Sequence, residues 1–330
     1  MNAHSNGTAL PTFVSTREDA LHQLGTRLPD AATAQEAFKF GRLSGWNVRK
    51  TPLLAQVGNQ QVPVPGTYAL VRDNPVVDNQ VDVLGTAGTG YNIIQHEDLE
   101  GLMDRIAEES GATFDTAGEL DGGRRAYLTM KLPGHAKAGG VDKMDNYITV
   151  LNSHDGNIGT WLMVTPVRPR CQSTLNLAFQ GGSHVFKVQH TTQAHKYLAQ
   201  LAHDALEFTF SYLDKVQEEA DRLIGTPLAQ GKFEQLIQHS FGAPKGAAVH
   251  TLTRTQNKLD HMAELFADSY NQTGVQGTAW AGLTALTEWH DHFSPVRGGE
   301  LSSTDARSIK AMMDPAFKNK ALKLMTAVAA

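Results

Sequence analysis

The stretch ATFDTAGELDGGRRAYLTMKL, residues 112–132, contains the strongest indication of the fold. Two β-prone runs flank an Asp-Gly-Gly sequence at residues 121–123, where glycine can adopt a positive φ at little steric cost. We therefore expect residues 112–120 and 124–132 to pair as an antiparallel hairpin. Strand side chains alternate between two faces, so the second run should have one apolar face. The other face then carries Arg125, Tyr127, Thr129 and Lys131, which predicts a cationic surface with one aromatic ring.

Similar short β-prone runs recur on both sides of this hairpin, bounded by Gly, Pro, Asn and Asp. They are TYALVRD, NYITVLN, TWLMVTPV and SHVFKV, with one helix expected among them from about Glu97 to Ser110. After Thr191 the apolar residues follow three- and four-residue steps to about Ile224, which predicts a long amphipathic helix. Further helices are expected at 229–240, 255–271, 277–292 and 304–325, the last broken at Pro315.

These patterns divide the chain into three parts. Residues 1–34 are polar and rich in Thr, Asn and Gly, which is typical of a loosely ordered leader. Residues 35–190 form a predicted β-rich domain, and residues 191–330 a predicted helical region. The predicted fold class is α+β: a mostly antiparallel sheet with hairpins followed by a helical C-terminal part.

Composition indicates an ordinary globular protein. The chain has 330 residues, of which 41% are hydrophobic and 19% charged, enough to bury a substantial core. Its single cysteine excludes an intramolecular disulfide and fits a reducing compartment. The first residues do not resemble a secretory signal, and no apolar run approaches the roughly 20 residues that span a bilayer. We expect a cytoplasmic protein without a membrane partner.

The charge is unevenly distributed. A net charge of −5 argues against binding duplex nucleic acid through overall charge. From Gly156 to His203, however, there is no Asp or Glu, whereas acidic residues are frequent between residues 97 and 121. A basic and an acidic zone on one chain can serve an anionic ligand, or can join copies head to tail. The sequence therefore also predicts a homo-oligomer, as a ring or filament.

The single cysteine raises the possibility of an enzyme. Cys171 follows Arg168-Pro169-Arg170, and cations or a helix N-terminus would favour its thiolate. His154 could act as the base beside Asp155, at the tip of a second hairpin. Adjacent turn residues tend to point apart, however, and no surrounding motif of a cysteine enzyme is present. A packed, unreactive Cys171 is the other interpretation.

Metal and cofactor sites are not predicted. The two histidines of His290-Asp291-His292 would lie about 200° apart on a helix, which prevents them from sharing a metal ion. The sequence contains no GxxxxGK[ST] phosphate loop, and LGTAGTG at residues 84–90 lacks the spacing of a dinucleotide-binding loop. We expect neither a metal nor a cofactor.

Several longer motifs resemble one family. They are SGWNVRKTPL, GRRAYLTMKLP, YITVLNSHDG, TPVRPRCQSTLNLA and GTAWAGLTALTEWHDHFSPVR, spread from about Gly25 to Arg297. In these motifs the chain is similar to a family of uncharacterised phage- and plasmid-encoded proteins, domain of unknown function 932. The resemblance implies a setting among accessory and recombination proteins of mobile elements, and it assigns no catalytic residue.

The remaining residues predict a surface for an extended anion. Arg125, Tyr127 and Lys131, together with Arg168, Arg170 and Lys187, would supply cations and a stacking ring, the combination that binds single strands. Tyr127 could instead belong to the core. The order of hairpins followed by a long helix is similar to the core of phage single-strand annealing proteins, an analogy of topology.

The functional prediction is a non-enzymatic protein of a phage or plasmid. It would bind single-stranded DNA in recombination or replication, in the cytoplasm of the infected or plasmid-bearing cell. Two alternatives stay open: a cysteine-dependent enzyme that uses Cys171 and His154, and an interaction protein that modulates a host or virion partner without DNA.

Overall fold

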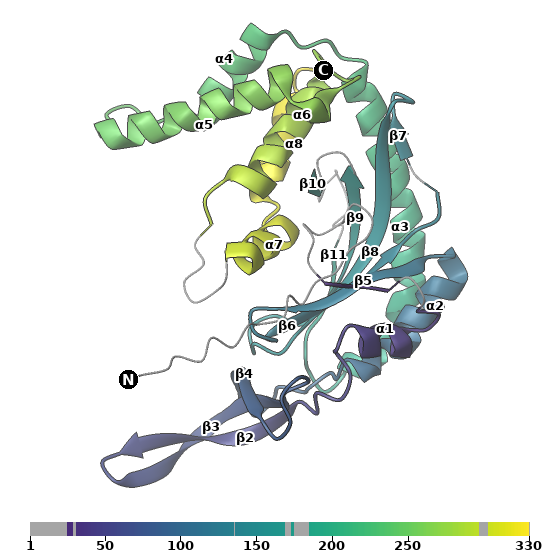
Figure 1. Cartoon of the computed structure of the whole chain (residues 1–330), viewed down its shortest axis with the longest axis vertical. Helices are drawn as coiled ribbons and strands as arrows, with labels where there is room; N and C mark the ends of the chain where they lie inside the picture. The colour runs from purple at the N-terminus through teal and green to yellow at the C-terminus, as the bar shows by residue number, and fades with distance from the viewer. Residues whose placement is uncertain are drawn as a thin grey trace, which may run out of the picture. The chain divides into compact units, whose positions relative to one another are not determined.

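The chain folds into two compact units, shown in the computed structural model of Figure 1. The structure describes residues 25–28, 31–134, 136–168, 173–174, 185–296 and 303–329. Unit 1 comprises residues 1–130, 149–162 and 187–202, and unit 2 comprises residues 131–148, 163–186 and 203–330. Both units combine segments from far apart in the sequence, because individual strands and the longest helix contribute residues to each. The predicted boundary at residue 190 rests on the change of periodicity in the sequence. The two units are instead defined by contacts within the folded chain, so their boundaries differ from it.

The larger sheet is built from hairpins. Its strand order is β1-β5-β6-β8-β9-β10, with β7 beside β8 and β11 beside β9. The strands are β1 (Thr26–Arg27), β5 (Thr113–Leu120), β6 (Arg125–Lys131), β7 (Ala136–Ala138), β8 (Asp142–Ser153), β9 (Thr160–Arg168), β10 (Ser173–Thr174) and β11 (Val185–Val188). Asp121, Gly122 and Gly123 have φ angles of 57°, 61° and 86° between β5 and β6. The predicted hairpin is therefore confirmed, with the left-handed turn that its Asp-Gly-Gly sequence favours.

A second sheet of three strands belongs to unit 1. It consists of β2 (Arg49–Val57), β3 (Gln60–Asp73) and β4 (Val81–Gly88) in antiparallel order. The β2–β3 pair forms a long ribbon that extends away from the rest of unit 1 (Figure 1). Five aliphatic side chains of this sheet are exposed, three on the ribbon and two on β4: Leu54, Val57, Val62, Val81 and Val83.

Arg72 fastens this sheet to the rest of unit 1. Its side chain is nearly completely buried, with Nε 3.1 Å from Asp82 and Nη1 2.5 Å from Glu119 on β5. The guanidinium also lies 4.0 Å from the ring of Trp46. A buried cation of this kind requires partners of opposite charge, and here they come from both sheets.

Apart from the helix Ala34–Phe40, which the sequence pattern did not predict, the longer helices occur close to the predicted ranges. Unit 1 contains α1 (Ala34–Phe40), η1 (Glu97–Leu99), α2 (Glu100–Ser110) and the beginning of α3 (Ala194–Ile224). Unit 2 contains the rest of α3, α4 (Gln230–Phe241), α5 (Val249–Asp268), η2 (Tyr270–Gln272), α6 (Ala279–Glu288), the π-helical turn η3 (Trp289–Phe293), α7 (Ser303–Met313) and α8 (Ala316–Thr326). Pro315 separates the last two, as expected. With antiparallel sheets and a helical C-terminal part, the α+β class is confirmed.

The core of unit 2 joins the long helix to strands and to the C-terminal helices. Tyr212 and Val216 of α3 pack in one apolar cluster with Met144 of β8 and Val164 of β9. The same cluster includes most of the buried face of α6, and Trp280 there donates from Nε1 to Asp142 Oδ2 at 2.6 Å. The strand ends and the helices of unit 2 therefore share one core.

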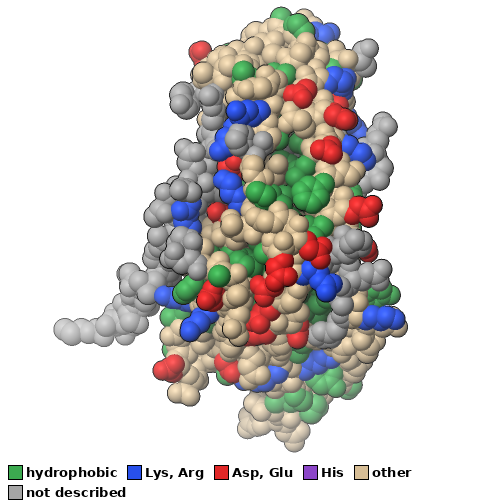
Figure 2. Space-filling model, turned by 90° about the vertical axis from the view of Figure 1, so that its right-hand side faces the viewer, with side chains coloured by type: hydrophobic (Ala, Val, Ile, Leu, Met, Phe, Trp, Pro, Cys, Tyr) green, Lys and Arg blue, Asp and Glu red, His purple; other side chains and the backbone are tan. Residues whose placement is uncertain are grey.

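The solvent side of α3 is acidic. Between residues 204 and 222 this helix carries six acidic and two basic residues. Figure 2 shows the face on the right-hand side of Figure 1, where acidic side chains are interspersed with basic and apolar ones. Phosphate groups are repelled by such an excess of acidic residues. This side of α3 is therefore poorly suited to bind a nucleic acid strand.

Candidate functional site in unit 1

Unit 1 contains a pocket of about 380 Å3 built from three separate chain segments. The first runs from the end of β4 to Tyr91, the second is the connection between β8 and β9, and the third follows β11. They contribute Ala87, Gly88, Gly90, Tyr91, Gly156, Asn157, Ile158, Gly159, Gln189, His190 and Thr191. The volume is within the range of small-molecule pockets, about 300 to 1,000 Å3.

Glycines allow these three segments to approach one another. A Cβ atom at Gly156, whose φ is +79°, would lie 2.0 Å from Thr86 O, and one at Gly159 would lie 2.0 Å from Val188 O. At Gly85 the same atom would lie 2.6 Å from Asp155 O. Real Cβ atoms do not approach backbone so closely, so any side chain here would force the segments apart. The pocket wall depends on these glycines.

A chain of hydrogen bonds leads from the pocket wall into the interior. Tyr91 Oη lies 2.6 Å from His190 Nδ1, and His190 Nε2 lies 3.0 Å from Thr160 Oγ1. Thr160 donates its proton to Asn152 Oδ1 at 2.8 Å, so it can only accept from His190. In the neutral ring Nε2 then carries the proton and Nδ1 accepts from Tyr91. The pocket wall thus presents an oriented Tyr91–His190 pair.

The inner end of this chain is a group of buried imidazoles. Asn152 Nδ2 lies 3.2 Å from His96 Nδ1, and the ring of His96 lies 5.0 Å from that of His154. Burial, followed by the charges of Arg72 and His190, lowers the pKa of His96 to about 3. Burial also lowers the pKa of His154 well below its ordinary value. Both rings are therefore neutral at physiological pH.

Asp155 shapes the connection between β8 and β9. Its Oδ1 accepts the backbone N–H groups of Asn157 at 2.8 Å and Ile158 at 3.1 Å, and its Oδ2 accepts from Arg125 at 2.9 Å. Burial opposes ionisation, but these hydrogen bonds keep the pKa of Asp155 below its ordinary value. Burial and this carboxylate raise the pKa of Tyr91, so its hydroxyl stays protonated. Asp155 is therefore an ionised carboxylate that holds the pocket-lining segment 156–159 in place through hydrogen bonds.

Among the predicted phosphate contacts, only Lys187 has an exposed ammonium in unit 1. It lies on β11, and its Nζ is 4.0 Å from the ring of Trp161 on β9. Arg125 is largely buried in its ion pair with Asp155. Lys187 and Trp161 are each two residues along the chain from pocket-lining residues, Gln189 and Gly159. Lys187 is therefore a predicted phosphate contact that lies beside an aromatic ring, that of Trp161, and near the pocket.

The predicted stacking ring at Tyr127 is buried. Only 1% of Tyr127 is exposed, and Thr129 on the same face of β6 is also buried. A Cβ atom placed on Gly25 would lie 2.5 Å from Tyr127 Oη, and one on Gly118 would lie 3.1 Å away. The chain around Gly25 thus covers the face that alternation alone left open to solvent. The predicted cationic face with an exposed aromatic is not present on β6, and Tyr127 belongs to the core.

The other predicted contacts belong to unit 2 or lie outside the described residues. Lys131 Nζ is 2.8 Å from Asp145 Oδ2, and the same carboxylate also pairs with Lys143 Nζ at 3.2 Å. The backbone of Arg168 ends β9 and pairs with Ser173. Arg170 lies outside the described residues.

The residues of the alternative cysteine enzyme are placed only in part. Cys171 lies outside the described residues. His154 and Asp155 follow β8 directly, as expected, but both are buried rather than exposed at a tip. Neither ring nitrogen of His154 has a hydrogen-bond partner in the part of the chain that the structure describes.

The described residues contain no group of three or more His, Cys, Asp and Glu side chains arranged to hold a metal ion, and the imidazoles of His96, His154 and His190 are no exception. Within the same residues, no helix combines the length and the apolar character needed to cross a membrane.

Sequence reasoning did not find the pocket. LGTAGTG was tested only as a dinucleotide-binding loop, and Gly156 and Gly159 only as turn residues. Nothing in the sequence links Tyr91 with His190, which lies 99 residues further along the chain. The available signal was the presence of two glycine-rich stretches, residues 84–90 and 156–159, which permit close backbone approach.

The chain belongs to the family described as Domain of unknown function (DUF932), which matches residues 83–313. This confirms the family predicted from the motifs, and the matched range includes every pocket-lining residue and both Lys187 and Trp161. No curated protein and no solved structure matches the chain. The phage and plasmid setting stays a prediction.

Proposed function

We propose that the protein binds single-stranded DNA through unit 1, as a non-enzymatic accessory protein of phage or plasmid recombination or replication. The observation that carries the proposal is the exposed Lys187 ammonium 4.0 Å from the Trp161 ring, on strands that lead to a glycine-lined pocket. Proteins that bind single strands combine cations for the phosphates with aromatic rings for the bases. The biological setting rests on the resemblance of the sequence to proteins of mobile elements.

The pocket suits one nucleotide of such a strand. Its wall offers backbone groups together with the Tyr91 hydroxyl oxygen, which His190 orients and which can accept a hydrogen bond from the edge of a base. A second cation lies close to its margin: Lys50 Nζ donates to Thr89 O at 3.0 Å, and Thr89 lies between two lining glycines. The ribbon that carries Lys50 has no acidic residue between Arg49 and Arg72. A strand approaching the pocket along the ribbon therefore meets no local negative charge from it.

We also propose that the protein acts as a homo-oligomer. The acidic solvent side of α3 complements exposed cations of unit 1 that do not line the pocket, such as Lys39 and Arg42, so two copies can join through unlike surfaces. Such a contact is heterologous and extends into a ring or filament. An assembly of this kind would place several pockets along one strand.

Replacing Lys187 by Ala is expected to weaken binding of a fluorescent single-stranded oligonucleotide, measured by anisotropy over a series of salt concentrations. One fewer counterion is released, so the log–log salt dependence should decrease by about 0.7. Trp161→Ala should instead reduce affinity by about 1 to 3 kcal/mol with little change of salt dependence, because it removes stacking.

Lys215→Ala is the matched control, because it removes one exposed lysine from the acidic side of α3 in unit 2. It should leave both affinity and salt dependence unchanged. Equal losses for Lys187→Ala and Lys215→Ala would show that only overall charge matters and would refute the site. Absence of salt-sensitive binding by the unmodified protein would refute the function.

A second candidate function is partner binding through the exposed aliphatic side chains of the three-stranded sheet. Val57 and Val83 are each 64% exposed, and several exposed apolar side chains on one sheet are typical of a protein interaction site. This alternative would be favoured if the protein does not bind single-stranded DNA but binds a host or virion protein, and if Val57→Ser abolishes that binding.

A further inference from the structure

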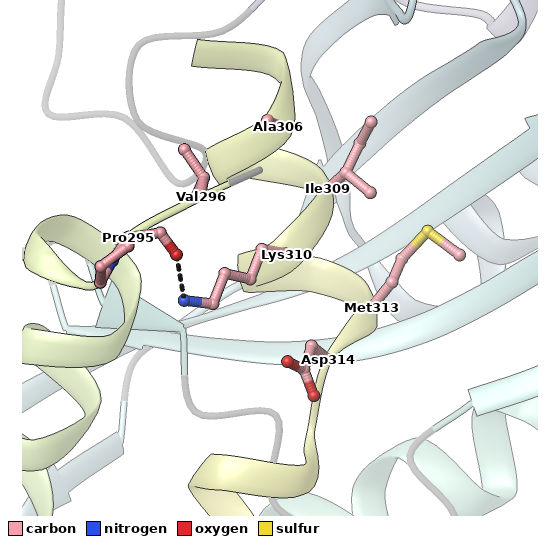
Figure 3. Close-up of a pocket in the computed structure, with 7 residues that line it drawn as sticks. All are labelled: Pro295, Val296, Ala306, Ile309, Lys310, Met313 and Asp314. Atoms are coloured by element: carbon pink, nitrogen blue, oxygen red, sulfur yellow. Dashed lines mark hydrogen bonds between the residues drawn. The ribbon is translucent and has the colours of Figure 1, made fainter. Parts of the chain in front are cut away.

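Unit 2 contains an apolar pocket of about 310 Å3 that has no part in the proposed function. Pro295 and Val296, which follow the π-helical turn η3, form one side. The other side is one face of α7 and its end: Ala306, Ile309, Lys310, Met313 and Asp314 (Figure 3). The only ammonium in this lining is that of Lys310, whose side chain reaches across to Pro295. An amine is thus held against mainly aliphatic walls.

The hydrogen bonds of Lys310 go to two uncharged acceptors, which either protonation state of the amine can satisfy. Its Nζ contacts Ser294 Oγ and lies 3.4 Å from Pro295 O. Ser294 donates its own proton to His290 O at 2.5 Å, so it accepts from Lys310. Both acceptors are uncharged, and within the described residues Lys310 forms no salt bridge. A neutral amine has two N–H bonds and one lone pair, so these two acceptors leave the lone pair unused.

The charges around Lys310 are largely engaged with one another. Lys318 and Asp291 form a fully buried pair at 2.9 Å, and His290 Nδ1 lies 3.0 Å from the same carboxylate. Arg307 donates to the carbonyl groups at the end of η3. Burial lowers the pKa of Lys310; Asp314 and Asp291 oppose this, while Arg307 and Lys318 add to it, and the net shift is downward. Desolvation beside other cations is a known way to make a lysine nucleophilic.

We propose that Lys310 is a reactive amine that captures a small apolar aldehyde or ketone as an imine in this pocket. The aliphatic walls select the apolar body of the ligand, and the amine selects its carbonyl group. The proposal concerns unit 2 alone and does not depend on DNA binding by unit 1.

The reaction consumes one amine and one carbonyl group and releases one water molecule. The Lys310 lone pair forms a bond to the carbonyl carbon while the C=O π bond breaks, and a proton passes from nitrogen to oxygen to give a carbinolamine. A second proton then reaches that oxygen, which leaves as water as the C=N bond forms and nitrogen loses its remaining proton. Asp314, in the pocket wall and half exposed, can exchange these protons with solvent.

The test is reductive trapping on the full chain. The protein is incubated with butanal and sodium cyanoborohydride, which converts an imine into a stable secondary amine, and peptide mass mapping follows modification at each lysine. Lys310 should be modified at least several-fold faster than any other described lysine. The internal comparison is Lys258, whose pKa is also lowered by burial and by Lys320, but whose Nζ donates to Phe241 O at 2.7 Å.

Variants can distinguish a reaction that depends on this pocket from one that depends only on the lowered pKa of a lysine. Lys310→Arg should abolish the fast modification while Lys258→Arg leaves it intact. Asp314→Asn should slow trapping by butanal yet leave acylation of Lys310 by acetic anhydride unchanged, since acylation needs no proton for a departing water. Modification of Lys310 no faster than Lys258 in the unmodified protein would overturn the proposal, and this result does not depend on whether any variant folds.

Discussion

Replacing Lys318 by Met is expected to lower the free energy of unfolding by about 3 to 5 kcal/mol. Both side chains of the Lys318–Asp291 pair are completely buried, and Lys318 also donates to Ala311 O at 3.0 Å. Removal of the cation leaves a carboxylate without water and without its main compensating charge. The cost comes from this uncompensated anion more than from the lost attraction. Urea denaturation followed by tryptophan fluorescence measures the change.

The double variant Lys318→Met with Asp291→Leu should be more stable than Lys318→Met alone. It removes the anion together with the cation, and buried ion pairs are often replaceable by apolar side chains. Lys323→Met, at an exposed position of the same helix, should change stability by no more than about 0.5 kcal/mol. A loss below about 1 kcal/mol for Lys318→Met would contradict the burial of this pair.

The second large effect concerns pH. Stability is expected to fall as the pH decreases below about 6.5, because burial lowers the pKa of His96 to about 3 and that of His154 well below its ordinary value in the folded chain. The unfolded chain has ordinary histidine pKa values near 6.5, so it binds these protons first. Each histidine then removes about 1.4 kcal/mol per pH unit, and above pH 6.5 neither contributes. With its pKa lowered to about 3, His96 alone removes about 4 to 5 kcal/mol by pH 3.

The measurement is the free energy of unfolding by urea between pH 8 and pH 4.5. Below this range Asp155, Asp73 and Asp82, whose pKa values are lowered, also destabilise the fold. His154→Phe should reduce the slope between pH 6 and 4.5, and His250→Gln, on the surface of α5, should not. A slope that is the same in His154→Phe as in the unmodified protein would show that His154 titrates normally.

The fold could be predicted where local signals agreed with it. The hairpin at 121–123 and the helices after Thr191 follow from turn chemistry and periodicity, both of which are local. In the ribbon, only TYALVRD at residues 67–73, the second half of β3, follows from the sequence pattern. The rest contains Pro52, Pro63 and Pro65, and proline cannot donate to a ladder. The structure accommodates them in an exposed two-stranded ribbon with a register shift between Pro52 and Leu54.

The site could not be predicted because its parts meet only in the folded chain. Alternation along β6 correctly separates two faces but cannot show that the segment around Gly25 covers one of them. Tyr91 and His190 are 99 residues apart, and no pattern in the sequence pairs them. Lys187 could be predicted because a single lysine is itself a candidate phosphate contact. That Trp161 lies beside it could not be predicted, because this depends on how β9 and β11 pair.

The central claim is that unit 1 holds a single strand at the glycine-lined pocket and at Trp161. Photocrosslinking of the full chain to single-stranded oligonucleotides containing 5-iododeoxyuridine, followed by peptide mapping, tests it most directly, because this base crosslinks to adjacent aromatic side chains. We expect crosslinks at Trp161 or Tyr91, suppressed by excess unlabelled single strands and retained in Lys215→Ala. Absence of crosslinks, or crosslinks confined to the residues of unit 2, would contradict the claim.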